Sequence, residues 1–320
     1  MAQNSDIGSY SSALSTHWSE YNDWAAFSRK QKKTLKFWRK TVLSLGIGGA
    51  VFETLAVSNI GSLVDIGGAN LFGVIGFIFL TLSAFFGRNV LGGGQEKDWV
   101  RSRSIAEKLK SEAYKYCMKV PPYHLENREQ KLVYNKNGLT NSNGSIPVIP
   151  NASNKEKKSF PSENMDVSEY ISTRIFDQID PNKGYYWKAA KDNIKKVKRF
   201  KYAALCIGSI SAVLGGFGAL KAMNVAIWVA AFTTLSTSIT AYFQASRYEY
   251  LVLSYSATAR RIKNIYDSWT ANPDFNDISK FVQACEDAIS FENQAWLAEW
   301  LKPSKRIQPM MAQEMDQSDI

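Results

Sequence analysis

The sequence predicts an all-α integral membrane protein with four transmembrane helices in two parallel hairpins with cytoplasmic helical extensions. The first observation is a set of four mainly apolar stretches, at about 41–60, 66–86, 202–220 and 222–243. A helix needs roughly 20 apolar residues to cross about 30 Å of hydrocarbon. Only helices and closed barrels satisfy their own backbone in lipid, and these stretches lack the alternation of barrel strands. We therefore expect two helical hairpins.

The second observation is positive charge at both ends of each hairpin. Lys40 and Arg88 flank the first hairpin, and Lys201 and Arg247 flank the second. Because lysine and arginine concentrate on the cytoplasmic side, both hairpins are expected to begin and end in the cytoplasm. We therefore expect a protein of the plasma (inner) membrane, with both termini cytoplasmic and the lipid bilayer as a partner.

The chain begins with a serine-rich segment, residues 1–20, which has no apolar core behind a basic cluster and predicts a disordered tail rather than a signal peptide. The first two-span module is expected at 21–122. Its basic, aromatic stretch from Arg29 to Lys40 would suit a nucleic-acid or lipid patch. That stretch runs directly into the first span, so the positive-inside bias explains it and we expect no nucleic-acid partner.

A helix is predicted after the second span, from Lys97 to Met118, and Pro121 lies just beyond its end. Its packing seam has spacings of three and four: Ala106, Leu109, Ala113, Tyr116. The glycine triplet at 92–94 has neither a preceding strand nor the G-x-G-x-x-G spacing, so a phosphate-binding loop is not predicted.

Residues 123–164 are rich in Asn, Ser, Lys and Pro and predict a linker, with a short hairpin across 136–138. The second two-span module is expected at 165–302. Since no helix breaker follows the fourth span before Pro273, its helix should continue to that point. An amphipathic helix is predicted from Asp277 to Lys302, with Trp296 and Trp300 on a packing or assembly face. Residues 303–320 predict a flexible tail.

The two modules resemble each other in sequence. Trp24 corresponds to Trp187, the Lys32-Lys33 pair to Lys195-Lys196, and Phe37 to Phe200. These matches precede the first span of each hairpin and indicate a tandem repeat. Both copies keep one orientation, unlike the inverted repeats of many secondary transporters.

The fourth span is unusually rich in hydroxyl groups. Helical spacing places Thr233, Ser236, Thr237 and Thr240 on one face, with Gln244 near the cytoplasmic end. One interpretation is close packing, in which each hydroxyl bonds to a carbonyl or a neighbouring helix. The other is a wet pore face, formed when several copies turn this stripe toward a common axis.

Glu53 is the one ionisable residue placed within an expected span, where a charge costs on the order of 3 kcal/mol at the helix centre. It either attracts ions inside the membrane or lies at the outer interface beside Asn59 and Asp65.

Enzyme chemistry is not expected. Cys117, Cys206 and Cys285 are far apart and form no disulfide framework or Cys-x-x-Cys motif. His17 and His124 have no second ligand at metal spacing, and no Ser-His-Asp grouping can be traced. We therefore expect no catalytic residues, no cofactor and no metal.

Three stretches of the second module resemble the SLATT superfamily, the SMODS- and SLOG-associated two-transmembrane effectors of bacteria. They are the opening segment with Tyr170, Arg174 and Gln178 that runs to Tyr186-Trp187, the hairpin, and the closing helix with Phe281-Val282, Glu286, and Glu292 to Trp296. The resemblance covers about 165–300. The first module resembles a more divergent copy that lacks the closing helix.

The resemblance implies a homo-oligomeric, pore-forming ion channel in bacterial defence. Its opening would follow a stress or nucleotide-type signal from a nucleotide-signalling partner protein. A non-conducting scaffold that recruits a cytoplasmic partner or anionic lipid is the alternative, and a small transporter is a further one.

Overall fold

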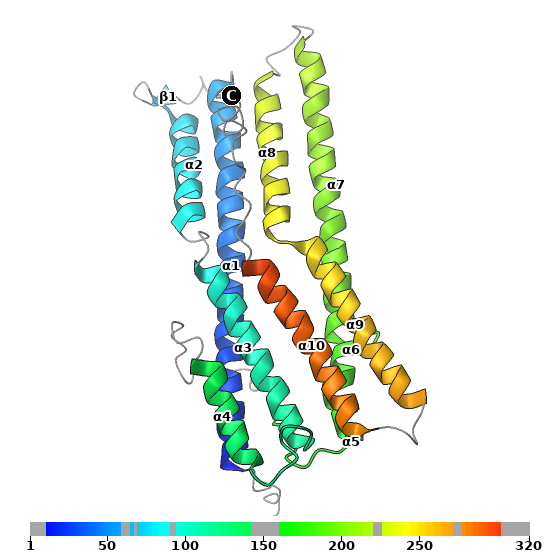
Figure 1. Ribbon diagram of the computed structural model, residues 1–320. Coiled ribbons are helices and arrows are strands. Elements are labelled where there is room, and N and C mark those ends of the chain that lie inside the picture. Colours follow the sequence, from blue (N-terminus) through cyan, green and yellow to red (C-terminus); the bar gives the residue numbers. More distant parts are fainter. Residues whose placement is uncertain are drawn as a thin grey trace, which may run out of the picture.

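The computed structural model describes residues 11–58, 65–66, 69–89, 94–141, 160–219, 226–271 and 277–301. Two long helices, α1 (Ser12–Val57) and α7 (Tyr185–Ala219), run through the length of the molecule (Figure 1). At one end each pairs with a shorter helix, α1 with α2 (Leu71–Asn89) and α7 with α8 (Ala226–Ala245). These are the two expected hairpins.

Three helices in the described part of the chain are long and apolar enough to cross a membrane: α1, α2 and the Tyr185–Phe217 part of α7. Together with the helical architecture, this confirms an all-α membrane protein. Helix α8 has 20 residues and no charged side chain, but its Thr and Ser residues lower its hydropathy. The fourth span therefore stays a prediction.

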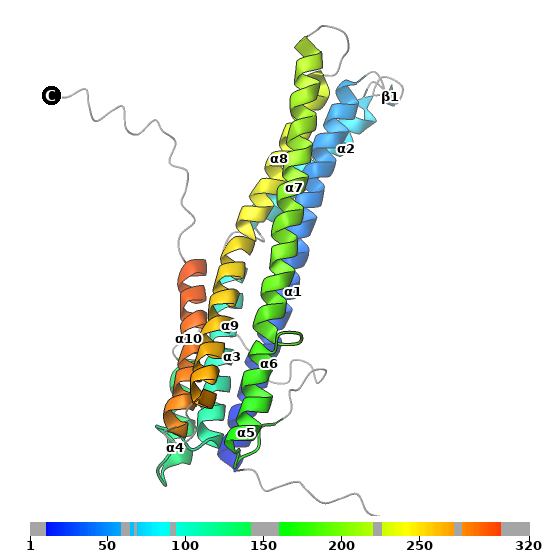
Figure 2. The same ribbon diagram turned by 90° about the vertical axis from the view of Figure 1, so that its right-hand side faces the viewer.

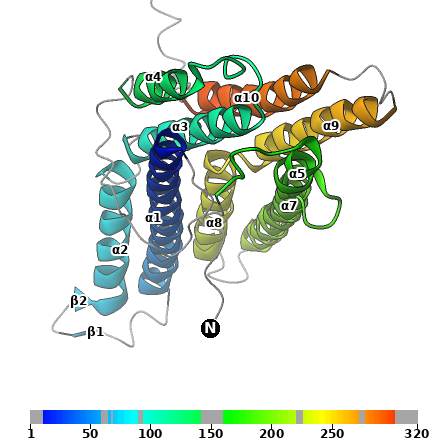
Figure 3. The same cartoon turned by 90° about the horizontal axis from the view of Figure 1, so that it is seen from below.

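The four apolar helices stand in one row. Helix α1 packs on α2 and on α8, and α8 packs on α7, which gives the order α2, α1, α8, α7 (Figures 1 and 3). Helix α8 is thus a central member of the row, next to the other module.

The outer end of the first hairpin differs from the prediction. Strand β1 (Asp65–Ile66) pairs antiparallel with β2 (Ala69–Asn70), so the second span begins at Leu71 rather than at Ile66. The side chain of Asn70 explains this start, because its Oδ1 accepts hydrogen bonds from the amides of Phe72 and Gly73 (3.0 and 3.3 Å). The first span ends at Val57 rather than at residue 60.

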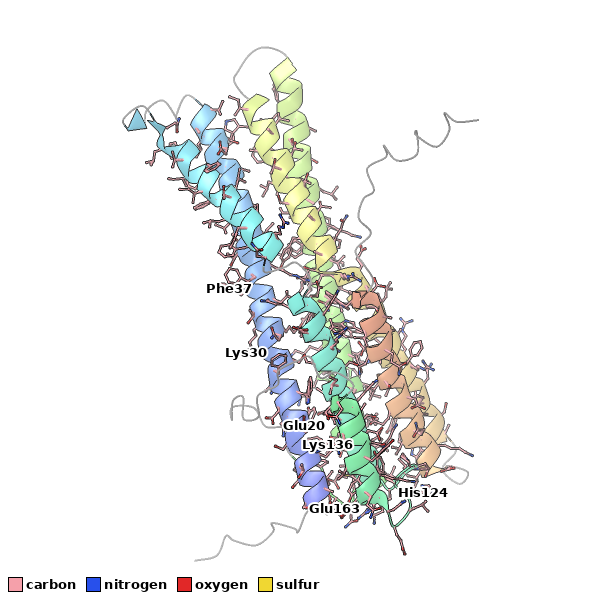
Figure 4. The ribbon with its side chains drawn as sticks, turned by 60° about the vertical axis from the view of Figure 1, so that its left-hand side comes forward. Glu20, Lys30, Phe37, His124, Lys136 and Glu163 are labelled. Carbon is pink, nitrogen blue, oxygen red and sulfur yellow. The ribbon has the colours of Figure 1, made fainter. Side chains whose placement is uncertain are left out.

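The expected tail at 1–20 is also shorter than predicted. Ser11 caps α1 by accepting a hydrogen bond from the Leu14 amide (3.2 Å), and Leu14, His17 and Trp18 are buried. Figure 4 shows Glu163 beside this first turn, where its Oε2 accepts a hydrogen bond from the Ser11 amide (3.0 Å). Residues 1–10 of the expected tail lie outside the described residues.

The remaining helices form a helical bundle below the row. They are α3 (Gly94–Cys117), α4 (Arg128–Asn141), α5 (Val167–Tyr170), the π-helix η2 (Ile171–Ile175), α6 (Phe176–Ile179), α9 (Tyr248–Ala271) and α10 (Ile278–Leu301). Helices α3, α10 and α9 lie on one side of α1 and α7 (Figure 2). Helix α10 packs against both α3 and α9, so this closing helix contacts both modules.

Two local predictions in this region were wrong. The hairpin expected across 136–138 is part of α4, whose Leu132 is fully buried in the bundle core. The helix after the fourth span does not continue, because it breaks at Ser246 and Arg247, where Arg247 has a φ of 49°. The centre of the predicted linker, 142–159, and the predicted C-terminal tail, 303–320, lie outside the described residues.

Candidate functional site

The first hairpin is held together by close contact between glycine and large side chains. A Cβ added at Gly76 of α2 would lie 2.9 Å from the Cγ and the backbone nitrogen of Glu53. A Cβ at Gly49 would lie 2.7 Å from Leu80. Such close approach is typical of membrane helix pairs, which associate through small residues.

Glu53 is half-buried against α2, one turn before α1 ends at Val57 and therefore near the outer end of the hairpin. Its depth in the membrane, and with it the choice between the two interpretations, stays a prediction. Asn59, one of its expected neighbours, lies outside the described residues. A role for Glu53 in attracting ions stays a prediction.

The hydroxyl groups of α8 divide between two environments. Ser211 of α7 forms hydrogen bonds with Thr233 (2.9 Å) and with the carbonyl of Val229 (3.2 Å), and Ser236 donates to the carbonyl of Ala204 (3.2 Å). These contacts join α8 to α7. Thr237 and Thr240 instead donate to carbonyls one turn back in α8 itself (2.8 and 2.9 Å).

The exposed positions described in α8 carry only small or polar side chains: Ala230, Thr233, Thr234, Thr237, Thr240, Ala241, Gln244, Ala245. Thr233, Thr237, Thr240 and Gln244 are all exposed, whereas Ser236 is half-buried against α7. The other three helices of the row expose large apolar side chains. Examples are Val51 of α1, Phe77 of α2 (67% exposed) and Leu205 of α7 (65% exposed). No large apolar side chain is exposed on α8 within its described residues.

One interhelical contact occurs in both hairpins. Ser83 of α2 donates to the carbonyl of Val42 in α1 (3.0 Å), as Ser236 of α8 donates to Ala204 in α7. A glycine lies one turn further along the first helix in each case, Gly46 and Gly208, next to the serine. The shared geometry agrees with the sequence match between the modules.

The helical bundle contains a fully buried ion pair. Arg174 of η2 donates to Glu286 of α10 through Nε (2.9 Å) and Nη2 (2.8 Å), and the hydroxyl of Tyr170 donates to the same carboxylate (3.0 Å). Burial alone would raise the pKa of Glu286, but the charge of Arg174 and the hydrogen bonds from Arg174, Ser111 and Tyr170 lower it. The carboxylate therefore stays charged.

A tryptophan cluster lies where the bundle meets the membrane row. Trp99 of α3 contacts Trp296 and Trp300 of α10 edge to face, with ring centroids 5.0 and 5.4 Å apart. The guanidinium of Arg39 lies 5.6 Å from the centre of the Trp300 ring, and that of Arg247 lies 5.1 Å from it. One indole thus contacts cations from α1 and from the joint between α8 and α9.

Arg247 forms the joint itself. Its Nη1 donates to the carboxylate (2.8 Å) and to the backbone carbonyl of Glu299, near the end of α10. A left-handed backbone is unfavourable for a residue with a Cβ, so these contacts hold the chain in the turned conformation. Helix α8 is in this way attached to the closing helix α10.

The family-like residues of the second module mostly come together in the bundle. Tyr170, Arg174 and Glu286 form one network, and Trp296 belongs to the tryptophan cluster, as the packing interpretation of the last helix predicted. The partnership of Arg247 with Glu299 was missed. The sequence gives only a weak signal for this contact. Arg247 directly follows the fourth predicted span, and Glu299 lies near the end of the last predicted helix.

Two family models match the chain. Residues 170–296 match the SMODS and SLOG-associating 2TM effector domain 1, and residues 22–131 match a protein family of unknown function (DUF4231). No curated protein and no solved structure matches the chain. The first match contains α7 and α8, the buried Arg174–Glu286 pair and Trp296 of the tryptophan cluster. Domains of this type are two-transmembrane effector domains associated with bacterial defence systems. The chain is therefore a membrane protein that contains a SLATT-type domain at residues 170–296.

Proposed function

We propose that the protein is a homo-oligomeric ion channel of bacterial defence, in which copies of α8 surround a water-filled pore. The observation that carries this proposal is the exposed polar face of α8, formed by Thr233, Thr237, Thr240 and Gln244, in a row whose other helices expose large apolar residues. An apolar face suits lipid, and a polar face at membrane depth suits water or another subunit.

The bundle supplies a means of control in this proposal. Helix α8 is connected through Arg247 to Glu299 and Trp300 of α10, and α10 also packs against α3 of the first module. A signal that moves α10 would therefore move the cytoplasmic end of α8. The signal would come from a nucleotide-signalling partner protein, and the chain would lie in the plasma membrane with both termini cytoplasmic.

The tandem arrangement is part of this proposal. The repeated serine-to-carbonyl contact, Ser83 to Val42 and Ser236 to Ala204, supports two copies of one hairpin. Each chain would then contribute one polar helix, α8, and one apolar counterpart, α2.

The scaffold alternative has its own supporting observation. The lower half of α7 exposes a series of basic side chains: Lys188, Lys191, Lys195, Lys198, Arg199, Lys201. Such a series would bind an acidic protein partner or anionic headgroups without any ion flux.

Ion flux from liposomes distinguishes the two functions. Purified protein in liposomes filled with potassium salt should release K⁺, and Thr237→Leu should lower the rate while the oligomer, measured by light scattering in detergent, stays intact. Thr81→Leu on the exposed face of α2 is the matched control and should conduct like the wild type. Absence of flux from folded, oligomeric protein would favour the scaffold.

A further inference from the structure

A cavity of about 300 Å³ lies in the bundle between the two modules. Helices α1 and α3 of the first module, α6 and α7 of the second, and α10 all contribute to its wall. Its volume is at the lower end of the range for small-molecule sites. A molecule bound there would contact both modules at once.

The cavity wall carries excess positive charge. It contains four cationic side chains, Arg29, Lys32, Arg103 and Lys110, against two carboxylates, Glu107 and Asp177. Arg103 also lies 3.7 Å from the carboxylate of Glu292 on α10, a residue that does not line the cavity. The lining is therefore two units more positive than negative.

The environment of Lys32 reports the same excess. Although its side chain reaches solvent, desolvation against the protein, reinforced by the charges of Arg103, Lys196 and Lys36, lowers the pKa of Lys32 to about 8. These cations come from α3, α7 and α1. Three cations from three helices thus lie close enough to Lys32 to disfavour its charge, and an anion bound in the cavity would favour that charge again.

We propose that this cavity binds a small phosphate-bearing anion. Two guanidinium groups match the paired oxygens of a phosphate, and two ammonium groups add point charges. The hydroxyl-bearing rings of Tyr21, Tyr185 and Tyr186 line the same space and offer hydrogen bonds and apolar faces. The positive excess of the lining favours an anionic ligand.

The position of the cavity favours a free ligand over a lipid headgroup. Its α1 residues extend from Tyr21 to Lys32, and the first span is expected from residue 41, so Lys32 lies roughly 13 Å along the helix axis from the start of that span. Figure 4 shows Phe37, an exposed aromatic residue, between Lys30 and the two apolar hairpins.

The test is calorimetric titration of the full chain in detergent, at low salt, with inorganic pyrophosphate and with inorganic phosphate. We expect saturable binding of pyrophosphate, weakened at least about tenfold by Lys32→Gln and by Arg29→Gln. The matched control is Lys30→Gln, because Lys30 is exposed, lines no part of this cavity and lies on the opposite face of the α1 helix. Thermal unfolding of each variant would show whether folding is retained, as expected because Lys30 and Lys32 are exposed and Arg29 is only half-buried.

Three outcomes would overturn the proposal. The first is no binding of pyrophosphate to the folded wild type at millimolar concentration. The second is equal weakening by Lys30→Gln, which would indicate non-specific attraction. The third is that the protein binds anionic phosphatidylglycerol in nanodiscs through these residues but binds no pyrophosphate in neutral phosphatidylcholine nanodiscs. That result would show that the positive charges bind lipid headgroups. None of these measurements depends on whether the chain conducts ions.

Discussion

Arg174 and Glu286 form a bidentate ion pair with side-chain exposures of 1% and 0%, joining the segment before α7 to the closing helix α10. The pair lies 112 residues apart in sequence and closes the second module around its core. Both charges are desolvated, so each depends on the other.

Removing one partner of this pair should be strongly destabilising. Glu286→Gln leaves the Arg174 guanidinium buried without a counter-charge, and we expect the free energy of unfolding to fall by about 3–5 kcal/mol. The double variant Arg174→Met with Glu286→Leu should recover most of that loss. Denaturation in detergent followed by circular dichroism measures both.

The matched control is the exposed pair Lys263–Asp267 on α9, with side chains 53% and 52% exposed. Asp267→Asn should change the free energy of unfolding by less than about 0.5 kcal/mol. If Glu286→Gln and Asp267→Asn lowered the free energy of unfolding equally, the buried Arg174–Glu286 pair would contribute no more to stability than an exposed pair.

The α1–α2 contact predicts opposite outcomes for two neighbouring glycines. Gly76→Ala would place a methyl group 2.9 Å from the backbone nitrogen of Glu53, which has no flexible way to move aside, and should destabilise by about 1–3 kcal/mol. Gly73→Ala meets only the Ala56 Cβ, at 3.6 Å, and should be tolerated. Thermal unfolding in detergent compares them, and a stable Gly76→Ala variant would contradict this packing.

His17 predicts a loss of stability in mild acid. Its Nε2 lies 2.8 Å from the carbonyl of Leu109, and burial lowers its pKa below the usual 6.5. The unfolded chain therefore binds a proton at a higher pH than the folded one, so stability falls as the pH drops below 6.5. The slope contributed by this residue is at most about 1.4 kcal/mol per pH unit.

The variant His17→Gln tests that assignment, because an amide can still donate to the Leu109 carbonyl but does not titrate. The midpoint of its thermal unfolding should depend less on pH between 6.5 and 5 than that of the wild type. Both proteins would be measured in the same detergent. Identical pH profiles for the two proteins would exclude His17 as a source of acid sensitivity.

Two substitutions of Arg247 should separate the effect of its backbone strain on stability from the effect of its side-chain contacts. Arg247→Gly fits the φ of 49° without strain but loses the contacts to Glu299 and Trp300, so hydrogen exchange at the end of α10 should accelerate. Arg247→Ala loses the contacts and keeps the strain, and should be less stable than Arg247→Gly by about 1 kcal/mol. Arg261→Ala, which removes a cation over the exposed Phe291 ring, should leave that exchange unchanged.

Hydrophobic periodicity predicted most helices, because a helix that packs on others buries one face. In α3, for example, the predicted seam residues Leu109 and Ala113 are buried. The joint at Arg247 was not predictable, since no glycine or proline marks it and its partners come from α10. The first turns of α1 were missed for the same reason: Leu14 and Trp18 are scattered among serines, and their burial depends on distant helices. Local composition also misled at Gly138, which lies within α4.

The hydroxyl-rich face of α8 was visible as a pattern of Thr233, Ser236, Thr237 and Thr240. Its division between packing and exposure was not, because helical spacing alone does not say where the neighbouring helix lies. Ser211 and Ala204 of α7 supply that information by bonding to Thr233 and Ser236.

The most direct test of the central claim is whether water reaches the exposed face of α8 inside the membrane. In a Cys206→Ser background, Thr237→Cys and Thr240→Cys proteins in liposomes would be treated with a charged, membrane-impermeant thiol reagent during a K⁺ flux measurement. A pore lined by α8 predicts that both cysteines are modified and that flux is blocked, whereas Thr81→Cys on α2 has no effect. Flux that continues with Thr237 and Thr240 cysteines unmodified would contradict a pore lined by α8.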